Sequence, residues 1–79
     1  MMYIEELKVL PIYFKELVTG NKTFEVRKND REYKVGLKLI LREFENNTFT
    51  GRSIEKTVTY VLKGGQYGLD KDYVILGIK

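Results

Sequence analysis

The chain has 79 residues and contains neither cysteine nor histidine, which limits how so small a domain can be held together. Domains of this size often depend on disulfides or on a structural metal ion. Without thiolate or imidazole groups, disulfide staples and the usual zinc sites are excluded. The chain must therefore be stabilised by one well-packed hydrophobic core, and we expect residues 1–79 to form a single domain.

The same absence removes the common nucleophilic centres. Cysteine nucleophiles and serine–histidine–aspartate triads both need a residue type that this chain lacks. An enzyme built from it would have to use lysine, glutamate, aspartate, tyrosine, serine or threonine. We expect no metal site and no bound cofactor.

The apolar runs of the chain are short, and none approaches the ~20 residues that a membrane-spanning helix needs. Glu5 and Glu6 lie where a secretory signal would carry basic residues. We therefore expect a cytoplasmic protein that does not associate with membranes, and we expect it to be a monomer.

One short helix is predicted early in the chain. Pro11 suits the first helical position, because the N–H that proline lacks would have no partner there. Gly20 supplies the left-handed residue at which helices often end. Four apolar residues fall on one face at helical spacing, namely Leu10, Phe14, Leu17 and Val18. The pattern predicts a helix of about two turns that packs this face on the core.

Five β-strands are predicted around this helix, at Glu6–Leu10, Thr23–Arg27, Lys38–Phe44, Arg52–Leu62 and Tyr73–Ile78. Glu45–Gly51 reads as a hairpin connection, and Tyr60 is in phase with core residues of its strand. Five strands are too many for one helix to cover as a small open sheet. We therefore expect an α+β fold, a small barrel of about five strands with one short helix after the first strand.

The second predicted strand has one apolar and one polar face. Alternation places Phe24 and Val26 on the first, and Thr23, Glu25 and Arg27 on the second. This strand lies in the segment 22–42, which carries seven basic and three acidic residues and a net charge of +4. Such a local excess suits a phosphate or a polyanion, although a solvated surface would look the same.

Several short motifs occur in a characteristic order. The run from Gly20 to Arg27 has the form Gly-x-Lys-Thr-x-Glu-x-Arg and is followed by Asn-Asp-Arg. The later pieces are Val35-Gly36, Leu41–Glu43, Thr50–Arg52, Val58–Leu62 and Tyr73–Gly77. From about Glu6 to Ile78 the chain resembles the ASCH group of the PUA-like superfamily. More narrowly, it resembles a small bacterial and phage domain family of unknown function within that group.

The resemblance implies a β-barrel with a cleft beside the Gly-x-Lys-Thr turn, and RNA or a nucleotide-like ligand in that cleft. Some relatives in the wider group resemble amidohydrolases that act on acetylated cytidine and use a lysine followed three residues later by a threonine. Lys22 fits the lysine, but Glu25 stands at the threonine position. Glu5 and Leu37 also depart from the pattern, where histidine and aspartate are expected.

The residue types in this region suit the recognition of a nucleotide. The planar guanidinium of Arg27 suits a phosphate, and the ammonium of Lys22 can meet a backbone phosphate. Glu25 can accept a hydrogen bond from an amino group on a base edge, as carboxylates do with cytosine. The bland alternative is an ordinary surface ion pair of Glu25 with Arg27 or a lysine, which stabilises little.

The predicted ligand-binding residues are Lys22, Thr23, Glu25, Arg27, Asn29, Arg31, Arg42 and Tyr67. Tyr67, in a glycine-rich loop, is the best candidate for stacking on a base. Turn formation by Asn29 and solvation of the arginines are the alternatives.

We expect a non-catalytic domain that binds RNA or a nucleotide in this basic cleft. One alternative is an amidohydrolase on a modified nucleoside with Lys22 and Glu25 as the reactive pair, although a neighbouring carboxylate favours the charged, unreactive lysine. Another is a phage or bacterial protein-interaction domain whose basic face meets an acidic partner.

Overall fold

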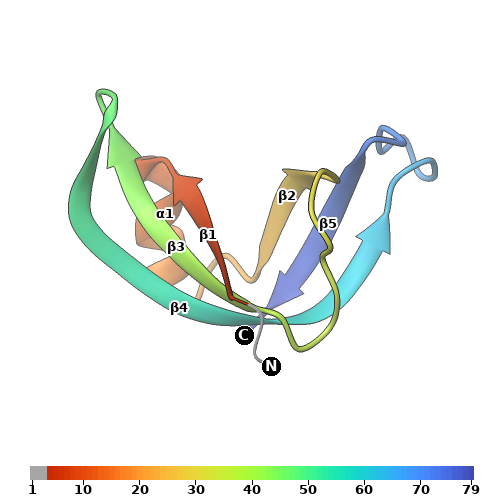
Figure 1. The fold of residues 1–79 in the computed structure, drawn as a ribbon, viewed down its shortest axis with the longest axis horizontal. Coiled ribbons are helices and arrows are strands. Elements are labelled where there is room, and N and C mark those ends of the chain that lie inside the picture. Colours follow the sequence, from red (N-terminus) through yellow and green to blue (C-terminus); the bar gives the residue numbers. More distant parts are fainter. Residues whose placement is uncertain (1–3) are drawn as a thin grey trace.

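A computed structural model describes residues 4–79 as a five-stranded mixed sheet with one short helix (Figure 1). The elements are β1 (Ile4–Val9), α1 (Pro11–Val18), β2 (Phe24–Lys28), β3 (Lys38–Glu45), β4 (Thr48–Lys63) and β5 (Tyr73–Ile78). The strand order is β1-β3-β4-β5-β2, with β1 and β3 parallel and every other pair antiparallel. The prediction of five strands and one helix in an α+β arrangement is confirmed.

The long strand β4 joins the two halves of the sheet. Its first part pairs with β3 and its last part with β5, so it runs along both arms of a V-shaped fold (Figure 1). The hairpin before it is tighter than the predicted connection Glu45–Gly51, because only Asn46 and Asn47 lie between the strands. Both have positive φ angles, 52° and 61°, which asparagine tolerates and which two-residue hairpins require.

The sheet is open and not closed into the small barrel that we expected. Strands β1 and β2 are its two edges, and no backbone ladder joins them within residues 4–79. A side chain makes the connection instead, because Arg27 of β2 donates a hydrogen bond of 2.8 Å to the carbonyl oxygen of Lys8 in β1.

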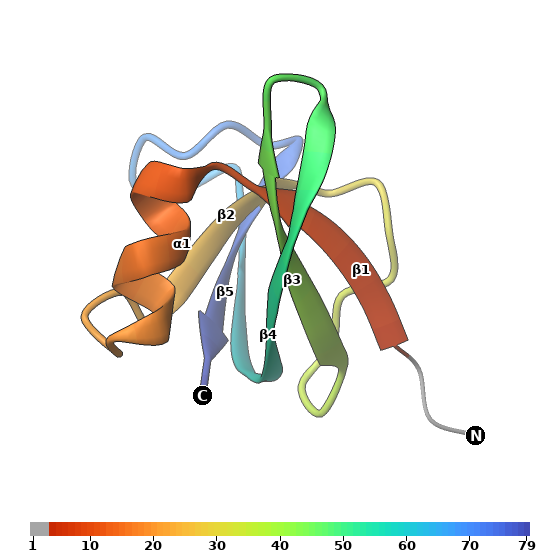
Figure 2. The same ribbon diagram turned by 90° about the vertical axis from the view of Figure 1, so that its left-hand side faces the viewer.

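The core lies on the inner face of the curved sheet, where α1 covers it from one side (Figure 2). Its buried residues are Leu7, Val9, Phe14, Leu17, Leu37, Leu39, Leu41, Val58, Val74, Leu76 and Ile78. Phe14 and Leu17 confirm half of the predicted helix face. Leu10 and Val18 are exposed instead, because Leu10 is the extended residue before the helix and Val18 is its last residue.

Tertiary structure changes one predicted orientation and sets another that the sequence left open. Tyr60 is 64% exposed, so its assignment to the core was wrong. An irregularity in the pairing between Val58 and Tyr60 shifts the alternation by one residue and turns Tyr60 outward. In β2 the polar face is the inner one, since Glu25 is 4% exposed whereas Phe24 and Val26 are 45% and 47% exposed.

Candidate functional site

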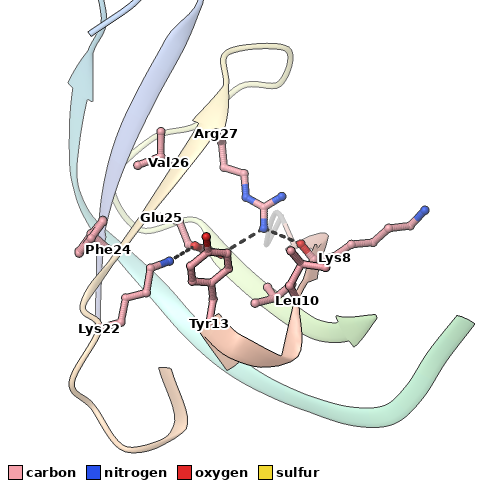
Figure 3. A pocket seen from close by; sticks show the side chains of 9 residues that line it. Lys8, Leu10, Tyr13, Lys22, Phe24, Glu25, Val26 and Arg27 are labelled. Atoms are coloured by element: carbon pink, nitrogen blue, oxygen red, sulfur yellow. Dashed lines mark hydrogen bonds and ion pairs between the residues drawn. The ribbon is translucent and has the colours of Figure 1, made fainter. Parts of the chain in front are cut away.

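A buried carboxylate lies between two cations at the inner face of β2. Glu25 Oε2 is 2.6 Å from Lys22 Nζ, and Glu25 Oε1 is 3.1 Å from Arg27 Nη2 (Figure 3). Period-two alternation along β2 places Glu25 and Arg27 on the same face. Each carboxylate oxygen therefore has one cationic donor and retains capacity for a further hydrogen bond.

Lys22 is held in place by its backbone and by two aromatic rings. Its N–H donates to the carbonyl oxygen of Glu16, which ties the turn before β2 to the end of α1. Its ammonium lies 5.1 Å from the ring centre of Tyr13 and 5.0 Å from that of Phe24. These contacts place a cation, a carboxylate and two aromatic side chains within one small region.

Arg27 is only partly satisfied. Its Nη2 donates hydrogen bonds both to Glu25 Oε1 and to the carbonyl oxygen of Lys8. Its Nε is buried and has no hydrogen-bond partner among residues 4–79. Buried donors are nearly always paired in native proteins, so this Nε is an exception among the described residues.

A cavity of about 440 Å³ adjoins these groups (Figure 3). It is lined by Lys8, Val9, Leu10, Tyr13, Lys22, Phe24, Glu25, Val26 and Arg27. The side chain of Lys8 points away from it (Figure 3). This volume and the mixture of apolar walls with a few polar groups are typical of small-molecule sites. We call this space the Glu25 cavity.

A second cavity of about 350 Å³ shares Lys8 and Arg27 with the first. It is lined by Glu6, Leu7, Lys8, Arg27, Arg31, Arg42 and Phe49. Arg31 Nη1 lies 2.8 Å from Glu5 Oε2 and 3.1 Å from the Glu6 carbonyl oxygen. The Arg42 guanidinium lies 3.8 Å from the ring centre of Phe49. We call this space the arginine cavity.

The structure brings together five of the eight residues predicted from sequence. Lys22, Glu25 and Arg27 line the Glu25 cavity, and Arg27, Arg31 and Arg42 line the arginine cavity. The other three, Thr23, Asn29 and Tyr67, line neither cavity. Tyr67 is 91% exposed in the loop after β4.

Sequence reasoning missed the aromatic walls of both cavities. Tyr13 lies on the exposed side of a predicted helix, and Phe49 fell in the predicted hairpin connection. No local pattern distinguishes either residue from an ordinary surface aromatic. Two of the three departures from the pattern have structural roles, since Glu5 pairs with Arg31 and Leu37 is buried in the core.

A second buried carboxylate, Glu43, lies outside both cavities. Arg52 donates to both of its oxygens, at 2.8 and 2.6 Å, and the Thr50 hydroxyl donates at 2.7 Å. The hydrogen bonds from Arg52, followed by that from Thr50, hold the pKa of Glu43 below its ordinary value. These hydrogen bonds join β3 to β4 beside their hairpin, so the role of the cluster is structural.

This cluster predicts a pH dependence of stability. Because the folded state lowers the pKa of Glu43, its ionised form stabilises the fold above the ordinary carboxyl range. That stabilisation is lost as the pH falls through the range to the lower folded-state pKa. We expect the melting temperature of the native protein to fall more steeply between neutral and acidic pH than that of Glu43→Gln, measured by circular dichroism. Parallel curves for the two proteins would contradict this.

The described residues contain no helix that is long and apolar enough to cross a membrane. Nor do residues 4–79 contain a group of three or more acidic side chains placed to hold a metal ion.

Comparison with known proteins places the chain in a family. A family model described as a domain of unknown function, DUF3850, matches residues 4–78. The chain belongs to the DUF3850 family. It is also 40% identical over 76 residues to an uncharacterised 12.9 kDa protein in the GpA 3′ region of Escherichia phage P2. That match covers 96% of this DUF3850 chain and 68% of the phage protein. The prediction of a small domain family of unknown function with phage relatives is confirmed at this level.

Proposed function

We propose that this DUF3850 domain binds RNA or a nucleotide-like ligand without catalysing a reaction on it. The observation that carries the proposal is the buried Glu25 carboxylate, set between Lys22 and Arg27 in a cavity that adjoins a second one lined by arginines. One cavity offers a hydrogen-bond acceptor among apolar and aromatic walls, and the other offers guanidinium groups. A nucleotide has the matching pair of chemistries, a planar base and a phosphate.

The Glu25 cavity suits the base. A carboxylate accepts hydrogen bonds from an exocyclic amino group, which phosphate and ribose lack. Tyr13 and Phe24 provide aromatic surface beside it, and stacking on such rings is a common way to hold an unpaired base.

The arginine cavity suits the phosphate. Arg27, Arg31 and Arg42 line it, and the guanidinium fork matches two phosphate oxygens at once. Arg27 lines both cavities, so one side chain can contact the phosphate while it orients Glu25.

We also propose that the family lies within the ASCH group of the PUA-like superfamily. The order of the sequence motifs supports this placement. The curved sheet with a helix after its first strand is then an opened form of the barrel, with the cleft between its two edge strands.

The geometry favours binding over hydrolysis. An amidohydrolase would need a neutral lysine, whereas the Lys22 ammonium lies 2.6 Å from the Glu25 carboxylate and beside two aromatic rings. Incubation with acetylated cytidine should therefore give no turnover above that of Lys22→Ala.

Salt dependence provides the direct test. We expect fluorescently labelled single-stranded RNA to bind at low ionic strength, measured by anisotropy. The logarithm of its affinity should fall linearly with that of the salt concentration, by about 0.7 per phosphate contacted. Lys22→Ala should weaken binding while the melting curve stays cooperative. Absence of binding to RNA, single-stranded DNA and mononucleotides at low salt would refute the proposed function.

A further inference from the structure

An aromatic surface covers the outer face of β2, β5 and β4, opposite the core. Its members are Phe24, Val26, Tyr60, Leu62, Tyr73 and Ile75, none of which is fully buried. Exposed apolar patches on small proteins commonly mark binding sites. We call this patch the outer aromatic face.

The strand register arranges this face in rows. Phe24 of β2 and Tyr60 of β4 both lie opposite Gly77 of β5, which stands between them. With neighbouring strands about 4.8 Å apart, β2 and β4 are about 9.6 Å apart here. Because Gly77 has no side chain, the surface between Phe24 and Tyr60 is bare backbone, which we call the floor. A planar base can therefore lie on this floor against either ring.

Two features of the backbone keep this arrangement. The pairing irregularity after Val58 turns Tyr60 outward, where strict alternation would have buried it. A Cβ at Gly77 would lie 3.1 Å from Thr59 Oγ1 and 3.4 Å from Tyr60 Cβ. A larger residue at position 77 would therefore crowd Tyr60 as well as fill the floor.

The outer aromatic face is continuous with the Glu25 cavity. Phe24 and Val26 belong to the edge strand β2, line that cavity and are also part of the outer face. Positive charge follows the same route. The Lys22 ammonium lies 5.0 Å from the Phe24 ring, and Lys28 lies opposite Tyr73 in the register.

We propose that the ligand is a single-stranded oligonucleotide, and that this domain holds one nucleotide in the two cavities and further bases on the outer aromatic face. The inference rests on the proposed function and deepens it, because it commits to a chain of nucleotides and assigns the further bases to the outer aromatic face. The face is continuous with the Glu25 cavity, and Lys22 and Lys28 lie beside it. Both features favour a polyanion over an apolar protein segment. Stacking on Tyr60 and Tyr73 would tolerate any base sequence.

The test compares ligand lengths. A mononucleotide, a dinucleotide, a tetranucleotide and an octanucleotide of single-stranded RNA are titrated into the full chain, with affinities from calorimetry or anisotropy. We expect the octanucleotide to bind at least about tenfold more tightly than the mononucleotide. Tyr60→Ala should remove most of this difference, since Tyr60 is exposed and lines neither cavity.

Tyr67→Ala tests the rival stacking residue, because Tyr67, the stacking candidate predicted from sequence, is an exposed tyrosine in the loop after β4 and lies off the outer aromatic face. Loss of the length dependence in Tyr67→Ala and not in Tyr60→Ala would overturn the proposal. Equal affinity for all lengths would overturn it too while leaving the proposed function standing, whereas binding of none would refute both. A dimer in solution that Tyr60→Ala converts to a monomer would show instead that a second copy covers this face.

Discussion

Arg27→Ala is expected to weaken RNA or nucleotide binding about a hundredfold, the largest effect of any single substitution in the two cavities. Arg27 lines both cavities, donates to Glu25, and bonds across the open sheet to the Lys8 carbonyl. Charge-assisted hydrogen bonds contribute roughly 1.5–3 kcal/mol each, so losing the phosphate contact alone corresponds to a loss of about tenfold to a hundredfold. The affinity is measured by anisotropy at low salt.

Two variants separate the role of Arg27 in binding from its role in the fold. Arg27→Lys keeps the charge but not the fork, and we expect it to recover only part of the affinity. Lys71→Ala removes one positive charge from an exposed position outside both cavities and should bind normally. Unchanged binding in Arg27→Ala would remove this residue from the site. A cooperative melt of Arg27→Ala would show that weak binding is not due to unfolding.

Local patterns predicted the elements and part of the site. Alternation along Thr23–Arg27 correctly placed Glu25 and Arg27 on one face, and Pro11 and Gly20 correctly bounded the helix. These features depend on backbone geometry over a few residues, which the sequence encodes directly. The alternative of an ion pair of Glu25 with Arg27 or a lysine was also stated, and the structure has both pairs at once, with the carboxylate buried and not on the surface.

Features that depend on the curvature of the sheet could not be predicted in this way. The phase of Tyr60 depends on a pairing irregularity in β4, which no residue type announces. The inner side of β2 carries Glu25 because the strand forms an edge beside a cavity, where a carboxylate can be paired with Lys22 and Arg27. Hydrophobicity alone would have turned Phe24 and Val26 inward.

The partners of Arg31 and Arg42 illustrate the same limit. Arg31 lies 26 residues from Glu5 in the sequence yet bonds to it, and Arg42 stacks on Phe49 across the hairpin. The positive charge of segment 22–42 indicated only that basic residues gather in this part of the chain. Only the pairing of β1 with β3 brings them to one cavity.

Gly64→Ala is expected to destabilise the fold by more than about 3 kcal/mol, because this position has no room for a side chain. A Cβ there would lie 1.8 Å from the Asp70 carbonyl oxygen and 2.6 Å from that of Tyr73. Both are backbone atoms, so the loop and the start of β5 would have to move together. Gly64 also donates its N–H to the Tyr73 carbonyl at 2.8 Å, and that hydrogen bond would be strained or lost.

Such a loss is a large share of the ~4–12 kcal/mol that a chain of this length is expected to have, and urea denaturation monitored by circular dichroism measures it. Gly68→Ala is the control, since a Cβ there meets no atom within 4 Å and only its φ of 78° is unfavourable, at roughly 1–2 kcal/mol. If Gly64→Ala were as stable as Gly68→Ala, the predicted clash of a Cβ at position 64 with the Asp70 and Tyr73 carbonyl oxygens would be contradicted. Because Tyr73 begins the strand that separates β2 from β4, a loosened loop should also weaken oligonucleotide binding on the outer aromatic face before it affects mononucleotide binding.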